Sequence, residues 1–283
     1  IRVFSPNQTA ANAGADQTIC STTATISLSA NSLIAPATGQ WTVVSGTGNF
    51  TSPTSPSTTV TGMSVGQNVY QWTIYNGPCV NPVALTDQVV VNVFSSAQTA
   101  ANAGPDQSIC STTSSVNLTG TTPIFPATGA WSVINGSGTF SDANSPITTV
   151  SGLSVGLNTF RYTISNGPCG SPTTDDVVIT VFDVNAPFAN AGADQAFCLP
   201  TTSATLGGNT PTFPATGVWT LVSGTGTITN PTSPTSGVTG LTVGKNIFRW
   251  TINNGTCGTI TNDLVSIFLF NSSQELPNAG PDA

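Results

Sequence analysis

The chain has 283 residues, enough for two or three domains, and only 5% of them are charged. The acidic balance, 11 Asp and Glu against 4 Lys and Arg, argues against nucleic acid as a partner, because phosphate backbones are bound by clustered Lys and Arg. A hydrophobic share of 38% argues against a disordered chain, and no apolar run approaches the roughly 18 residues of a membrane span.

One unit of about 90 residues is written three times. Its opening, Asn-Ala-Gly-Ala/Pro-Asp-Gln-x-x-Cys, starts at Asn12, Asn102 and Asn190, and it begins again at Asn278. We therefore predict the end of a preceding repeat with its linker at 1–11, and the start of a following repeat at 278–283. Between them we predict three repeats, each with its linker, at 12–101, 102–189 and 190–277. The neighbouring repeats of the same chain are its first expected partners.

Within each unit, hydrophobic residues alternate with polar ones, which predicts strands. In the first unit the pattern runs through Ile26 and Leu28, then Trp41-Thr42-Val43, then Tyr70-Gln71-Trp72-Thr73-Ile74, and ends at Val89-Val90-Val91-Asn92-Val93. No helical period is sustained anywhere. About seven short strands per unit predict an all-β chain of tandem β-sandwiches, and the Cys…Trp…Cys order is similar to that of immunoglobulin domains.

Two cysteines lie 59 positions apart in every unit. This constancy predicts one intradomain disulfide each, joining Cys20 to Cys79, Cys110 to Cys169 and Cys198 to Cys257. We place each bond near one end of its sandwich, because the second cysteine follows an Asn-Gly turn beyond the aromatic strand. Buried free thiols are the alternative, and the absence of His argues against zinc. Disulfides indicate an oxidising compartment.

The linkers have a fixed length. From the Phe that ends each last strand to the next opening Asn the step is 8 positions, starting from Phe4, Phe94, Phe182 and Phe270. A floppy tether would tolerate insertions at little cost. The constant step therefore predicts that neighbouring sandwiches meet in a repeatable geometry and form a stiff rod.

The repeated motifs resemble a known repeat type. Besides the opening, these are Thr/Ser-Gly-Met/Leu-x-Val-Gly-x-Asn and Trp/Tyr-Thr-Ile-x-Asn-Gly-x-Cys. Together they resemble the PKD-like, immunoglobulin-type repeats of giant cell-surface proteins of Bacteroidetes, including gliding-motility-associated adhesins. The resemblance covers all three units. It implies a sandwich fold, export by the type IX outer-membrane secretion route, a location on the bacterial cell surface and a role as a stalk or adhesin. It brings no catalytic residues.

Six aspartates recur at corresponding places and are the candidates for a metal site. Those in the openings are Asp16, Asp106 and Asp194, and those before the last strand are Asp87, Asp176 and Asp263. Pairs of carboxylates near a domain junction are suited to calcium, which prefers oxygen ligands. The alternative is that each Asp caps a turn through backbone amides. No other cofactor is expected.

Catalysis is not expected, because the chain has no His and its single Glu, Glu275, lies in a linker. The Gly-x-Gly segments precede no helical pattern, so they are interpreted as strand connections and not as phosphate loops. The Trp residues of the third strand are expected in the core, with a sugar site as the alternative. Ala35, Phe125 and Phe213 share a loop position before Pro, where they either contact a neighbouring domain or have no function.

These observations favour a structural stalk that projects a distal adhesive part. The alternatives are repeats that themselves bind polysaccharide or other cell-surface proteins, and an accessory region of a secreted hydrolase.

Overall fold

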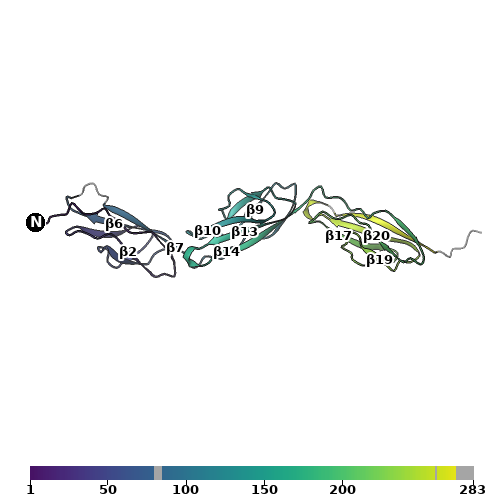
Figure 1. Ribbon diagram of the computed structural model, residues 1–283, viewed down its shortest axis with the longest axis horizontal. Helices are drawn as coiled ribbons and strands as arrows, with labels where there is room; N and C mark the ends of the chain where they lie inside the picture. Colours follow the sequence, from purple (N-terminus) through teal and green to yellow (C-terminus); the bar gives the residue numbers. More distant parts are fainter. Residues whose placement is uncertain (80–84, 259, 272–283) are drawn as a thin grey trace, which may run out of the picture.

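The computed structural model describes residues 1–79, 85–258 and 260–271. Three β-sandwich units lie end to end in an elongated array, with the N-terminus at one extremity (Figure 1). The predicted start of a following repeat, 278–283, lies outside the described residues. Within those residues, no helix has the length and hydrophobicity required to cross a bilayer.

The first unit comprises two sheets. One has the strand order β1-β7-β6-β3 and the other β2-β5-β4. The bounds are β1 Gln17–Cys20, β2 Thr25–Ser29, β3 Thr38–Ser45, β4 Asn49–Phe50, β5 Ser57–Thr61, β6 Gly66–Tyr75 and β7 Thr86–Phe94.

The second and third units repeat this topology, with sheets β10-β13-β14-β8 and β11-β12-β9, then β15-β21-β20-β17 and β16-β19-β18. The bounds in the second unit are β8 Gln107–Cys110, β9 Ser115–Thr119, β10 Thr128–Asn135, β11 Thr139–Phe140, β12 Ile147–Ser151, β13 Gly156–Ser165, the 3-10 turn η1 Gly167–Cys169 and β14 Thr173–Phe182. Those in the third are β15 Gln195–Cys198, β16 Ser203–Thr205, β17 Thr216–Ser223, β18 Thr227–Ile228, β19 Gly237–Thr239, β20 Gly244–Asn253, η2 Gly255–Cys257 and β21 Thr261–Phe270.

Every sheet is formed within one unit, so the prediction of tandem sandwiches of about seven strands is confirmed. The alternation in the sequence explains the core. In β6, Tyr70, Trp72 and Ile74 point inward and are at most 1% exposed, while the residues between them are partly exposed. Trp41 from β3 is 2% exposed and lies 5.2 Å from the Trp72 ring, centroid to centroid. The tryptophans of the third strand are therefore core residues, and they line no sugar site.

Each core also contains an asparagine that is at most 1% exposed, at Asn68, Asn158 and Asn246. In the second unit, the Asn158 side-chain oxygen accepts hydrogen bonds from the backbone N–H groups of Ser137, at 2.9 Å, and Ser154, at 3.2 Å. The Asn158 amide donates to Ser154 O at 2.8 Å. These bonds fasten the Gly136-Ser137-Gly138 segment, which connects β10 to β11, to the start of β13. The Gly-x-Gly segments are strand connections, as predicted.

Candidate functional site at the unit junctions

The first cysteine of each unit lies where the chain leaves that unit. Strand β1 pairs in parallel with the last strand, β7, in a register that sets Cys20 opposite Phe94. The same register sets Cys110 opposite Phe182 and Cys198 opposite Phe270. The second cysteine follows the strand that precedes the last one, and so lies at the opposite end of the unit.

This arrangement makes the predicted intradomain disulfides wrong. The 9 residues of β7 separate the two ends of the first unit by roughly 30 Å, whereas a disulfide needs Cα atoms within about 7 Å. Instead, Cys20 is bonded to Cys169 and Cys110 to Cys257, with Cα–Cα distances of 4.8 and 4.5 Å. We call these two bonds the junction disulfides, because each joins one unit to the next.

The constant spacing of 59 did not distinguish the two pairings. A bond from the first cysteine of one unit to the second cysteine of the next also recurs with the repeat. The shift by one unit leaves Cys79 and Cys198 as free cysteines.

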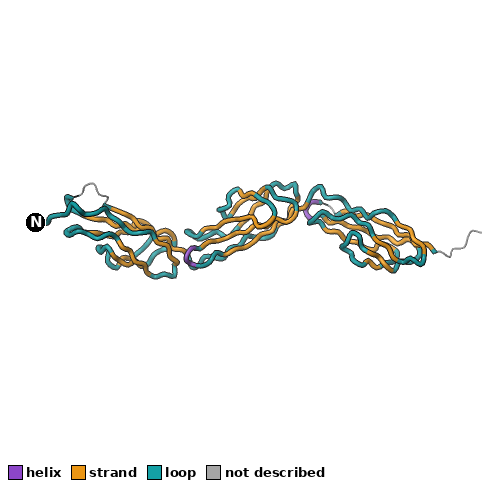
Figure 2. Tube along the Cα trace, in the orientation of Figure 1, coloured by secondary structure: helices purple, strands orange, loops and turns teal. Residues whose placement is uncertain are grey.

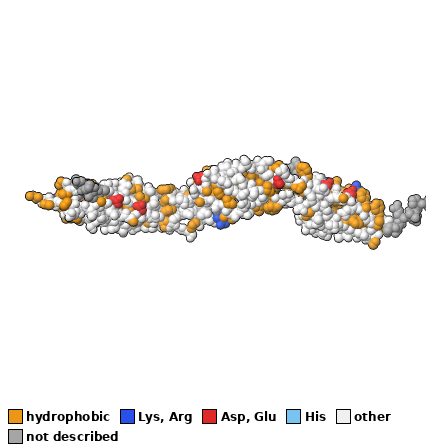
Figure 3. Space-filling view, turned by 45° about the horizontal axis from the view of Figure 1, so that its top comes forward, with side chains coloured by type: hydrophobic (Ala, Val, Ile, Leu, Met, Phe, Trp, Pro, Cys, Tyr) orange, Lys and Arg blue, Asp and Glu red, His pale blue; other side chains and the backbone are white. Residues whose placement is uncertain are grey.

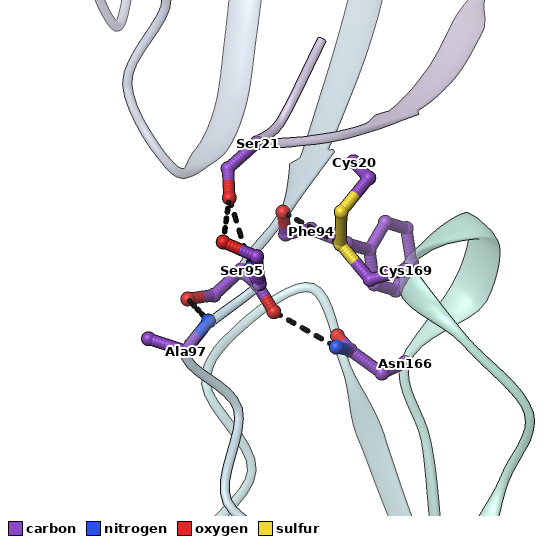
Figure 4. The surroundings of a disulfide bond; sticks show 8 residues. Cys20, Ser21, Phe94, Ser95, Ala97, Asn166 and Cys169 are labelled. Carbon is purple, nitrogen blue, oxygen red and sulfur yellow. Dashed lines mark hydrogen bonds between the residues drawn. A yellow bond between two sulfur atoms is a disulfide. The ribbon is translucent and has the colours of Figure 1, made fainter.

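A short turn of the second unit docks on the end of β7 (Figure 4). The side-chain amide of Asn166 donates to Ser95 O at 2.8 Å, and Cys169 Sγ lies 3.3 Å from Phe94 O. Gly167 has φ +48°, and its side-chain position is occupied by the ring of Phe94. Phe94 therefore contacts both halves of the junction: it is in register with Cys20 and packs under the turn that carries Cys169.

The Asn-Gly turn has a role that sequence reasoning missed. A tight turn with positive φ at both residues is expected for Asn-Gly. In the structure Asn166 has φ −109°, and only Gly167 is left-handed. The asparagine is instead used for its side chain, which reaches the linker of the preceding unit. The repeated Asn-Gly-x-Cys motif and the fixed Phe at each strand end were the available signals.

The junction between the second and third units has the same contacts. The Asn254 amide donates to Asp183 O at 2.7 Å, and Cys257 Sγ lies 2.9 Å from Phe182 O. Gly255 has φ +51° and is packed against the Phe182 ring. The two 3-10 turns, η1 and η2, mark the two junctions along the array (Figure 2).

Two further contacts close each junction. The Ser96 N–H donates to Ser21 Oγ at 2.9 Å, which ties the first linker back to the first unit. On the other side, a methyl group placed on Gly66 would lie 3.9 Å from the Phe125 ring. The corresponding distance from Gly156 to Phe213 is 3.6 Å. Phe125 and Phe213 thus lie beside a glycine of the preceding unit, which agrees with the first of the two expectations for this loop position.

Replacing Gly255 should test the docking. Gly255→Ala would place a β-carbon in the Phe182 ring and hold a left-handed φ, so we expect the third unit to be pushed off its neighbour. Formation of the Cys110–Cys257 bond in a refolding assay should slow at least tenfold. The matched control is Gly258→Ala at the end of the same turn, where φ is 179° and no described atom beyond the chain neighbours lies within 4 Å of the added β-carbon. Equal rates for the two variants would contradict the docking.

The candidate calcium ligands fasten the opening of each unit to its last strand. In the first unit, Asp87 accepts a hydrogen bond from Ala13 N at 2.7 Å and Asp16 accepts one from Val90 N at 2.8 Å. Asp106 and Asp194 likewise accept from Val178 N and Ser266 N, and Asp263 accepts from Ala191 N. These bonds join segments more than 70 residues apart, so they are not the local turn caps of the alternative.

The prediction is wrong for one of the six aspartates, Asp176. In the second unit the counterpart of Asp87 is Asp175, which lies opposite Tyr162 and accepts from Ala103 N at 2.8 Å. Asp176 instead forms a bidentate ion pair with Arg161 on the surface. Arg161 Nε donates to Asp176 Oδ1 at 2.7 Å and Arg161 Nη2 donates to Asp176 Oδ2 at 2.9 Å. The hydrogen bond from Arg161 lowers the pKa of Asp176. Among the described residues, no three Asp, Glu or Cys side chains come together, so calcium binding stays a prediction.

The adjacent aspartates give a matched pair for mutagenesis. Asp175→Ala should lower the free energy of unfolding by about 2 kcal/mol, because it leaves the N–H of Ala103, a buried residue, without its acceptor. Asp176→Ala should leave the free energy nearly unchanged, since its partner is exposed. Urea denaturation of both variants measures the difference. A larger loss for Asp176→Ala would contradict this assignment.

No protein-family model matches the chain. No curated protein matches it either. Among solved structures, a Dpr2 Ig1-Ig2 in complex with DIP-Theta Ig1-Ig3 gives a TM-score of 0.53 at 13% identity, covering 92% of this chain and 100% of that one. The fold is immunoglobulin-like. The titin fragment I67-I69, an E-to-A mutated variant, gives a TM-score of 0.44 at 12% identity, covering 92% of this chain and 97% of the fragment. The PKD domain from the KIAA 1837 protein covers 32% of this chain and 92% of its own, at 27% identity and a TM-score of 0.27.

Proposed function

We propose that this chain is a stalk segment of a large repetitive adhesin or surface filament on the bacterial cell surface, which projects a distal adhesive part. The observation that carries the proposal is the covalent closure of both junctions. Each unit is bonded to the next by a disulfide as well as by the polypeptide, and the turn that carries the bond is docked on the preceding strand end. Such junctions transmit load and resist bending.

The surface supports the same assignment. Charged side chains are sparse over the face seen in Figure 3, and Ser, Thr and Asn supply most of the polarity. The exposed aromatic residues Phe125 and Phe213 lie at junctions. The proposal gives the segment no catalytic role. Its disulfides suit an oxidising exterior, and the motif resemblance adds type IX export and a Bacteroidetes adhesin as the parent protein.

Two measurements on the full chain test this function. Anchored through its N-terminus and carrying an epitope after Ala283, the oxidised chain should hold the epitope at nearly the full length of the array above the surface. On a glycan array the same chain should show no saturable binding. Saturable binding to a polysaccharide, abolished by substitutions on the unit faces, would favour the reading in which the repeats themselves are the adhesive part.

A further inference from the structure

The two free cysteines, Cys79 and Cys198, occupy the positions of cysteines that are paired elsewhere in the array. Cys79 follows the Asn-Gly turn of the first unit, as Cys169 and Cys257 follow theirs. Cys198 ends β15 opposite Phe270, as Cys20 and Cys110 end their strands opposite a Phe. Each free cysteine is therefore one half of a junction.

The outer end of the third unit is open where the other two junctions are covered. Cys198 is exposed, whereas the corresponding strands β1 and β8 end in half-buried cysteines. Phe270 is 51% exposed, while Phe94 and Phe182 are half-buried. At the corresponding ends of the first two units, the disulfide-bonded turn of the next unit covers these residues. The end of the third unit therefore presents the same surface without a turn docked on it.

A second contact is missing at the same end. Within the described part of the chain, no atom other than those of its chain neighbours lies within 4 Å of a β-carbon placed on Gly244, whereas the same position on Gly66 and Gly156 lies 3.9 and 3.6 Å from Phe125 and Phe213 of the next unit. Beside Gly244 is a hollow of about 380 Å³ whose lining is mostly apolar and includes Val243, Phe268, Leu269 and Phe270. Its position fits the loop tip of a following unit.

The first unit presents the complementary half at the N-terminal end. The Asn76 amide donates to Ser5 O at 2.9 Å, the ring of Phe4 fills the side-chain position of Gly77, and the Cys79 thiol donates to Phe4 O at 3.6 Å. These are the contacts of a formed junction. They lack only the cysteine-bearing strand that would run beside residues 1–4.

We propose that Cys198 and Cys79 each form a junction disulfide with the complementary half of an adjoining unit of the same kind, so that the disulfides continue in register along the array. The partner of Cys198 is the Asn-Gly-x-Cys turn of the unit that follows on the same polypeptide. The partner of Cys79 is the cysteine that ends the first strand of the unit before it.

Two thiols lose two protons and two electrons when such a bond forms. A disulfide oxidant takes them: one oxidised glutathione is reduced to two glutathione molecules as one protein disulfide is made. The geometry disfavours a disulfide between separate copies. In each copy, Phe4 and Ser5 already occupy the docking position on the Asn76-Gly77 turn, so Phe270 of another copy cannot bind there.

The test joins the full chain to a second copy so that the linker keeps its length. Residues 1–277 are followed directly by residues 12–283, which places the second copy's Asn12 8 positions after Phe270. After oxidation with glutathione, peptide mapping should show Cys198 bonded to the second copy's Cys79. The joined chain should retain two reactive thiols, where unpaired Cys198 and Cys79 would give four. Cys198→Ser in the first copy alone should raise the number of reactive thiols from two to three, because the second copy's Cys79 loses its partner.

Four reactive thiols in the joined chain, with both junction disulfides intact in each copy, would overturn the proposal. Separate copies oxidised in the same way should remain monomers on a non-reducing gel. Disulfide-linked ladders from separate copies, suppressed by Cys198→Ser, would overturn the assignment to the same polypeptide. Replacing Ala35 of the second copy by Phe, as at Phe125 and Phe213, should speed formation of the new bond.

Discussion

Stretched between its two ends under oxidising conditions, the Cys79→Ser/Cys198→Ser chain should reach a contour length of about 37 nm and no more. The shortest covalent path runs from residue 1 to Cys20, across to Cys169, back to Cys110 and across to Cys257. That path has about 105 residues, at about 3.5 Å each when extended. Reduction should release the whole chain, about 100 nm. Single-molecule force spectroscopy measures both lengths.

The double variant is needed because the contour length of the original chain does not distinguish the junction disulfides from intradomain disulfides. With all six cysteines, intradomain pairing would shorten the path by nearly the same amount as the junction disulfides. In the double variant, intradomain pairing would leave only a Cys110–Cys169 bond and a contour length of about 79 nm. A length near that value would contradict the pairing described above. While both bonds hold, residues 21–109 and 170–256 lie outside the shortest covalent path, so no unit can be extended over its whole length.

Loss of both junction disulfides should convert the array from a rod to a hinged chain without unfolding its units. In the Cys169→Ser/Cys257→Ser variant each core remains complete, because the three hydrophobic clusters lie within single units. The remaining interactions at each junction are a few hydrogen bonds, one Phe under a glycine, and Phe125 or Phe213 beside a glycine of the preceding unit, a small interface that is expected to open and close.

Small-angle scattering distinguishes the two states. The oxidised chain should give a narrow distance distribution that extends to the sum of three unit lengths. The double serine variant should give a broad one with bent shapes, while its circular dichroism stays that of a β protein. Cys79→Ser/Cys198→Ser is the control and should scatter like the original chain. A variant as stiff as the original would show that the docked turns alone hold the rod.

The strands were predictable because burial follows the period of two directly. Tyr70, Trp72 and Ile74 alternate with polar residues in the sequence and point into the core in the structure. The order of strands was not predictable in the same way, and it decides the disulfides. Nothing in the local sequence around Cys20 states that its strand runs parallel to the last one, yet that register moves Cys20 to the end opposite Cys79.

The junction residues were visible as a pattern but not as a mechanism. The Asn-Gly pattern predicts a turn at Asn166, whereas the structure shows that its side-chain amide also donates to Ser95 O in the linker. The assignment of Asp176 is wrong although the sequence carried a signal: Asp87, Asp175 and Asp263 each lie 7 positions before the Phe that ends the last strand. The register across β13 and β14 agrees with that spacing, since Asp175 accepts a hydrogen bond from Ala103 whereas Asp176 pairs with Arg161.

Peptide mapping of the unreduced 283-residue chain, without adjoining units, tests the central claim most directly. Free thiols are first alkylated, and the chain is then cleaved on the amino side of Asp. We expect fragment 16–86 to be joined to fragment 142–174, and fragment 106–141 to be joined to fragment 194–262, with the alkyl groups on Cys79 and Cys198. A bond between fragments 106–141 and 142–174, with no alkylated cysteine, would contradict the account.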